Sequence, residues 1–134
     1  MDKKEYSVMA KEWFKKAESD FQYANASFES FDDFYSQICV LCHDAGEKYL
    51  KAYIIFLGEK PEKIHDLVTL HNQCVENREN DLDLVDLREG CKILNRYYIP
   101  LKYPSHYPAI DVTKVKEAME KIKKIREVIK RRIG

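Results

Sequence analysis

The sequence predicts an all-α protein, an antiparallel up-and-down bundle of four to five helices. Apolar residues recur every three or four positions through most of the 134 residues, as they do on the buried face of a helix. Glycine and proline number only four each and charged residues make up 34% of the chain, which is typical of helical globular proteins. No segment has the apolar and polar alternation of a strand. We expect one helical domain over residues 1–134.

The first two helices are expected over residues 6–28 and 33–57. Apolar residues of the first helix are spaced by four, three, four, three and four positions, which is typical of a bundle seam: Ala10, Phe14, Ala17, Phe21, Ala24 and Phe28. Gly58 and Pro61 follow the last periodic residue of the second helix and are expected to end it.

Three further helices are expected in the second half of the chain. One begins near His65, and the next follows the acidic segment 80–83, since carboxylates stabilise a helix N-terminus. Pro100 is expected to end that fourth helix. After the loop 99–110, Asp111 is a good N-cap for the last helix, whose final turn is basic, as favoured by the helix dipole.

Charge and hydropathy exclude several classes of protein. The formal net charge is zero, so no global field attracts the chain to nucleic acid or to a membrane surface. The first residues, MDKKEYSVMAKEWFKK, lack the apolar stretch of a signal peptide, and no run approaches the roughly 20 apolar residues of a membrane-spanning helix. We therefore expect a cytoplasmic protein that does not enter membranes.

A Cys-x-x-Cys-His string begins at Cys39 and could indicate haem attachment, zinc binding or a redox pair. Haem also needs axial ligands, and structural zinc needs a second close pair of ligands, whereas Cys74 and Cys91 each stand alone. A redox pair would lie at a helix start after a strand. Cys39 and Cys42 instead share the apolar spacing of residues 33–57, which favours two core residues. We expect no metal and no cofactor.

Four segments of the chain resemble a known family. They are residues 13–24 (WFKKAESDFQYA), 43–52 (HDAGEKYLKA), 65–67 with Leu70, and 98–104 (YIPLKYP). They occur in the order and rough spacing of the HEPN domain, the higher eukaryotes and prokaryotes nucleotide-binding domain, and the resemblance covers nearly the whole chain.

The resemblance implies a bundle similar to the substrate-binding domain of minimal nucleotidyltransferases, commonly a homodimer and often encoded beside a nucleotidyltransferase. It does not imply one activity. Members of the family include metal-independent ribonucleases, toxins of toxin–antitoxin pairs, and domains credited only with binding nucleotides.

The ribonuclease members use an arginine followed, after four to six residues, by a histidine. Arg96 lies too far ahead of His106 for this motif. Many relatives have Arg-Tyr-Pro where this chain has Lys102-Tyr103-Pro104, and lysine lacks the bidentate fork that arginine offers a phosphate. Lys102 and His106 are four residues apart, but the proline between them disfavours helical geometry. We expect a binding module and not an enzyme; a divergent ribonuclease toxin is the alternative.

The segment YYIPLKYPSHYP, residues 97–108, is the main candidate for nucleotide binding. Bases stack on tyrosine and phosphates pair with cations. We expect Lys102 and Arg96 to contact phosphate. Tyr98 and Tyr103 are expected to stack on the base, and His65 and His106 to make polar contacts. Alternatively, the tyrosines pack on the bundle while the prolines stiffen a connection between helices.

Other residues have structural alternatives to a functional role. His65 could cap the third helix, and His43 is expected at the boundary between core and surface. The basic segment 116–132 is expected to be a solvated helix face, with RNA binding as a less favoured interpretation. The expected partners are a nucleotide, a second copy of the chain and a nucleotidyltransferase.

Overall fold

A computed structural model describes residues 1–98 and 110–134. They form six helices, with no strand among the described residues: α1 (Lys3–Ser30), α2 (Tyr35–Phe56), α3 (Leu67–Val75), α4 (Leu82–Val85), α5 (Arg88–Asn95) and α6 (Val112–Ile133). Because α4 is a single turn, five helices of eight residues or more build the fold. The all-α bundle predicted from the sequence is confirmed.

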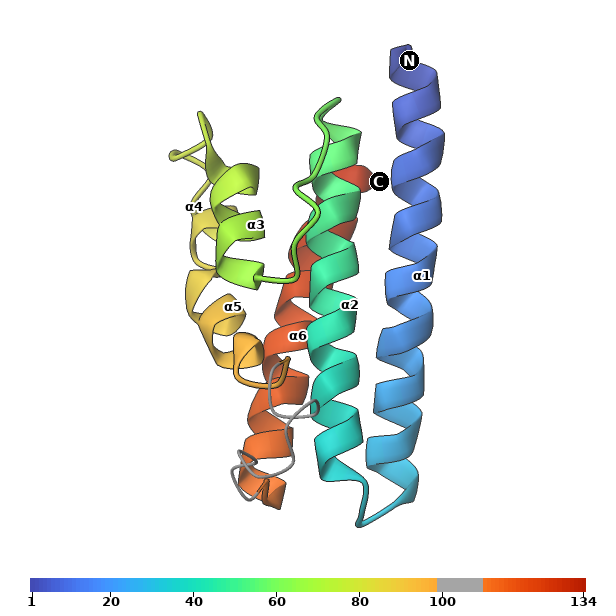
Figure 1. Cartoon of the computed structure of the whole chain (residues 1–134), viewed down its shortest axis with the longest axis vertical. Coiled ribbons are helices and arrows are strands. Elements are labelled where there is room, and N and C mark those ends of the chain that lie inside the picture. The colour runs from blue at the N-terminus through green and yellow to red at the C-terminus, as the bar shows by residue number, and fades with distance from the viewer. Residues whose placement is uncertain (99–109) are drawn as a thin grey trace.

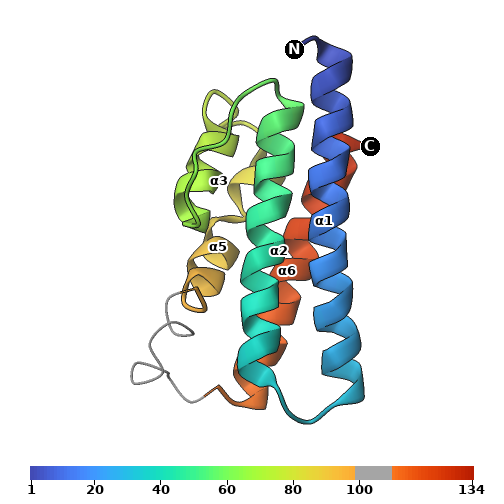
Figure 2. The same cartoon turned by 45° about the vertical axis from the view of Figure 1, so that its right-hand side comes forward.

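The three long helices lie side by side, and the short ones pack on one side of them (Figure 1). α1 and α2 run antiparallel through a tight connection, while α3 and α5 lie against α2 and α6. After α2, the segment 57–66 turns back along the bundle, so that α3 begins beside the middle of α2 (Figure 2). This return brings His65 next to a helix that ended nine residues earlier in the chain.

Aspartates begin four of the helices, because a short carboxylate can accept the unpaired amides of a first turn. Asp111 accepts a hydrogen bond from the amide of Lys114, as the sequence predicted. Asp66 accepts hydrogen bonds from Val68 and Thr69 at the start of α3. The proposed cap at His65 is therefore wrong: the aspartate after it caps α3, and the imidazole is directed elsewhere.

The predicted fourth helix is interrupted, giving α4 and α5. In a continuous α-helix the carbonyl of Leu84 would accept from the amide four residues later. Here it accepts from the amide of Leu87, only three residues later, at 3.2 Å. The same carbonyl accepts a hydrogen bond of 2.7 Å from Nε2 of buried His71 on α3. A tertiary hydrogen bond thus coincides with the tightened turn between the two short helices.

All four cysteines are buried thiols in the core of the bundle. Burial raises the pKa of the Cys39 thiol, and also that of the Cys91 thiol, to about 12, because a thiolate would lose its hydration there. Cys42 packs with its sulfur 3.5 Å from that of Met119 on α6. The interpretation of Cys39 and Cys42 as core residues is confirmed.

Gly58 adopts a φ of 81° directly after α2, a left-handed conformation that glycine takes without steric cost. This agrees with its predicted role in ending the helix. None of the helices in residues 1–98 and 110–134 is both long and apolar enough to cross a membrane.

Candidate functional site

A cleft of about 460 Å³ lies between the segment that leads into α3 and the end of α5. Its lining combines an ammonium, an imidazole, a carboxylate, an amide and a phenol ring with one aliphatic side chain: Lys63, His65, Asp66, Asn95, Tyr98 and Ile64. Small-molecule sites usually have a comparable volume and a few convergent polar groups. The cleft is therefore the candidate site.

Two of the six residues predicted for nucleotide binding, His65 and Tyr98, line this cleft. A third, Arg96, does not line it but directly follows Asn95, which does. Lys102, Tyr103 and His106 lie outside the described residues. The structure thus brings together two residues that are 33 positions apart in the sequence.

Tyr98 stacks against two imidazoles from different parts of the chain. Its ring centroid is 5.0 Å from that of His65 with the planes 30° apart, and 5.2 Å from that of His43 with the planes 24° apart. Offset stacking at such distances stabilises aromatic pairs. These contacts place Tyr98, the last described residue before position 110, at the wall of the cleft.

Asn95 fixes the floor of the cleft by joining α5 to the start of α3. Its Nδ2 donates to Oδ1 of Asp66 at 3.0 Å, and its Oδ1 accepts from the amide of Leu67 at 2.8 Å. The hydrogen bond from Asn95 is the main cause that lowers the pKa of Asp66, helped by amides of α3. Asp66 therefore stays a carboxylate, and its charge faces any ligand in the cleft.

His43 was expected at the boundary of the bundle, but it is fully buried on α2. Its Nε2 donates a hydrogen bond of 2.9 Å to the main-chain carbonyl of His65. This bond holds the returning segment 57–66 against α2. The role could not be predicted from the sequence, because the partner is a carbonyl 22 residues away that no side-chain pattern reveals.

Glu47, one helical turn after His43, receives hydrogen bonds on both carboxylate oxygens. Lys51 donates from Nζ at 2.8 Å, and His65 donates from Nδ1 at 2.9 Å. The side chain of Glu47 is almost covered, whereas that of His65 is 53% exposed. Glu47 therefore orients the imidazole of His65 at the rim of the cleft.

Arg96 projects into solvent beside this region. Its side chain is 63% exposed, and Nη1 lies 3.9 Å from Oε1 of Glu117 on α6. Such a long and exposed pair contributes little stability and can exchange for a stronger partner. Loss of the pair between Arg96 and Glu117 would therefore cost the fold little.

A second cavity, of about 390 Å³, lies between the N-terminal half of α1 and the end of α2. Its walls are mainly apolar and include Met9, Trp13 and Ile55. The ammonium of Lys51 approaches the ring of Trp13 at 5.9 Å, near the outer limit of a cation–π contact. Charged residues of the segment 59–63 also line this cavity but contribute little of its wall, so it is the weaker candidate for chemistry.

Comparison with known proteins gives one family and two related structures. The family model described as HEPN domain matches residues 10–133. The crystal structure of TT1696 from Thermus thermophilus superposes with a TM-score of 0.72 at 26% identity, over 91% of this chain and 96% of that one. ST0689, an archaeal HEPN homologue, has a TM-score of 0.71 at 21% identity, over 93% and 98%, which shows a shared fold. A search of curated proteins found no significant match.

Proposed function

The chain belongs to the HEPN domain family, and on this premise we propose that it is a nucleotide-binding module whose site is the cleft beside Tyr98. The observation that supports this best is the lining of the cleft. A lysine for phosphate, a tyrosine and a histidine for stacking, and an amide and a carboxylate for base or ribose converge on about 460 Å³.

The proposed roles follow from the chemistry of each group. Lys63 in the cleft and Arg96 beside it pair with phosphate oxygens. The rings of His65 and Tyr98 contribute to the stacking surface for the base. Lys102, Tyr103 and His106 follow Tyr98 within eight positions of the sequence. These three residues lie outside the described part of the chain, so their proposed roles in phosphate binding, stacking and polar contact rest on the sequence.

We also propose that the module works with other chains. A second copy of this chain and a nucleotidyltransferase are the proposed partners. Tyr23, Phe31 and Phe34 are exposed near the connection between α1 and α2 and are suitable for contact with another chain. Light scattering would test the homodimer, for which we expect about twice the 15.9 kDa of one chain.

Calorimetric titration with ATP tests nucleotide binding. We expect a dissociation constant between about 1 μM and 1 mM, as for a shallow site. Arg96→Ala should lower the affinity for ATP about fivefold, because a contact worth about 1 kcal/mol is lost.

The matched control is Arg131→Ala. Arg131 is 64% exposed and also lies 3.9 Å from one carboxylate, that of Asp83, but it is on the last turn of α6. Loss of affinity in both variants would indicate nonspecific attraction of phosphate. No heat of binding at millimolar ATP would contradict the proposal and favour a module that binds only a protein partner.

A further inference from the structure

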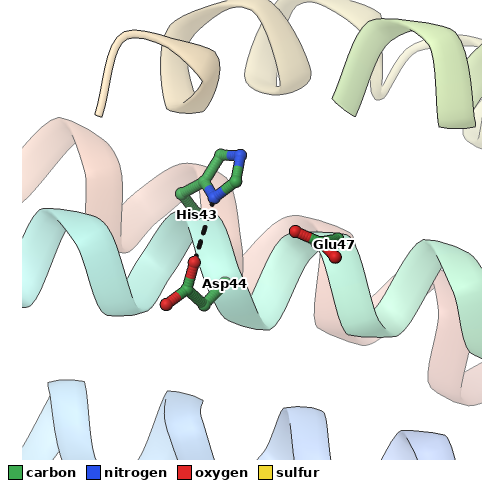
Figure 3. A group of neighbouring side chains, drawn as sticks. All are labelled: His43, Asp44 and Glu47. Carbon is green, nitrogen blue, oxygen red and sulfur yellow. Dashed lines mark hydrogen bonds and ion pairs between the residues drawn. The ribbon is translucent and has the colours of Figure 1, made fainter. Parts of the chain in front are cut away.

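We propose that His43, Asp44 and Glu47 of α2 form a binding site for a divalent transition-metal ion of the Mn²⁺ or Zn²⁺ type. Each residue offers one ligand atom, and these three atoms all lie within 4.8 Å of one another. Figure 3 shows the three side chains along one stretch of α2, with the His43 ring directed to the carboxylate of Asp44. A nitrogen ligand with two carboxylates suits these ions.

The hydrogen-bond partners of His43 place its second ring nitrogen beside a carboxylate. Nε2 faces the carbonyl oxygen of His65 at 2.9 Å, and because a carbonyl only accepts, Nε2 carries the proton. Nδ1 faces Oδ1 of Asp44 at 3.1 Å. One cation, a proton or a metal ion, can lie between these two atoms.

The arrangement at Nε2 is the one that metal-binding histidines usually have. Such a histidine donates the N–H of one ring nitrogen to a carbonyl or carboxylate. This hydrogen bond fixes the tautomer and leaves the other ring nitrogen for the metal. In this protein the carbonyl of His65 has that role, and burial of the ring holds it in place. Nδ1 of His43 is therefore already oriented toward Asp44 before an ion arrives.

The spacing of the ligand atoms also fits an ion. Two ligands about 2.1 Å from one ion, at roughly a right angle to each other, are about 3.0 Å apart. The 3.1 Å between Nδ1 of His43 and Oδ1 of Asp44 matches this value. Glu47 completes the set from the next helical turn, on the face shared by residues four apart.

The charged groups around the cluster leave room for an ion to enter. Asp44 is 41% exposed, so water reaches the site from its side. Lys51 and His65 each donate a hydrogen bond to Glu47, one to each carboxylate oxygen. Because His65 is half exposed, its ring can leave Glu47 and Tyr98 and turn to water, which releases one oxygen of Glu47 while Lys51 keeps the other. Only one exposed side chain therefore has to move.

Electron paramagnetic resonance of the full chain titrated with Mn²⁺ tests the site, because the signal of the free ion disappears on binding. We expect one Mn²⁺ per chain, displaced by an equal concentration of Zn²⁺, since nitrogen-containing sites prefer Zn²⁺ to Mn²⁺. Asp44→Asn should weaken Mn²⁺ binding more than tenfold. The control Asp83→Asn, which alters an exposed aspartate outside the cluster, should bind like the parent chain.

Asp44→Asn is chosen because the half-exposed position tolerates an amide, whereas substitution of buried His43 endangers the fold. Absence of Mn²⁺ binding at millimolar concentration, or equal affinity of the parent and Asp44→Asn, would overturn the proposal. A nitrogen-15 spectrum in which the ring of His43 stays doubly protonated with Zn²⁺ present would also overturn it. The experiments contain no nucleotide, so their result is independent of the nucleotide proposal.

Discussion

Glu18 on α1 and Arg126 on α6 are 108 residues apart in the chain and meet through two hydrogen bonds. Nε of Arg126 donates to Oε1 of Glu18 at 2.5 Å, and Nη2 donates to Oε2 at 3.0 Å. The hydroxyl of Tyr49 on α2 donates to the same carboxylate at 2.5 Å. Desolvation acts to raise the pKa of Glu18, but these hydrogen bonds and the positive charge outweigh it and lower the pKa. One carboxylate thus joins the three long helices.

We predict that Glu18→Ala lowers the free energy of unfolding by about 2 kcal/mol, because the charge-assisted bonds from Arg126 and Tyr49 are lost together. Urea unfolding followed by circular dichroism measures the change. Glu12→Ala, at an exposed position of the same helix, is the control and should change stability by less than about 0.5 kcal/mol. Equal losses in the two variants would mean that the carboxylate does not link the helices.

A second prediction concerns acid stability. Arg132 donates from Nε to Asp81 at 2.9 Å and makes a further short contact from Nη2, and the hydrogen bond to Arg132 is the main cause that lowers the pKa of Asp81. A carboxyl whose pKa is lower in the folded protein stabilises the fold above its unfolded pKa, and this contribution is lost as the pH falls through the folded value.

Stability should therefore decline below about pH 4, near the ordinary pKa of an aspartate. Asp81→Asn should reduce the slope of this decline, because the titrating group is gone. Urea midpoints measured from neutral to strongly acidic pH give the comparison. A variant with the same slope as the parent chain would assign the acid sensitivity to other carboxylates, such as Asp66.

We next predict that the four thiols do not react in the folded protein. Burial raises the pKa of each thiol, so very little thiolate exists at mildly alkaline pH and the reagent cannot reach the sulfur. Ellman's reagent should label none of them within minutes and all four in denaturant. Rapid labelling of one thiol without denaturant would show that the core opens locally. Cys39→Ala combined with Cys42→Ala should lower stability and leave nucleotide binding unchanged.

The last prediction concerns RNA. The family's arginine-to-histidine spacing is absent from the sequence, so we expect no cleavage of labelled single-stranded RNA by the pure protein in the presence of a chelator. His106→Ala should then alter ATP affinity about fivefold at most, as expected for one polar contact of about 1 kcal/mol. Cleavage by the parent chain that disappears in His106→Ala would establish the ribonuclease alternative.

The apolar periodicity determined the helices because it reports burial, which every helix of a bundle needs on one face. Ala10, Ala17, Phe21 and Ala24, four of the six seam residues predicted for the first helix, are buried on α1. Local chemistry also determined the helix start at Asp111 and the end at Gly58. These features depend on residues within a few positions of each other, so the sequence alone is sufficient for them.

The tertiary structure decided the features that depend on distant partners. The fourth predicted helix divides where the Leu84 carbonyl meets His71, and the Nε2 of buried His43 finds its partner in the carbonyl of His65. Both carbonyls belong to chain segments that are distant in the sequence from the histidines they contact. The sequence indicated His65 and Tyr98 as candidates, but only packing sets their rings side by side. A hydrogen bond to a main-chain carbonyl leaves no trace in side-chain patterns, and the fold had to be known to find it.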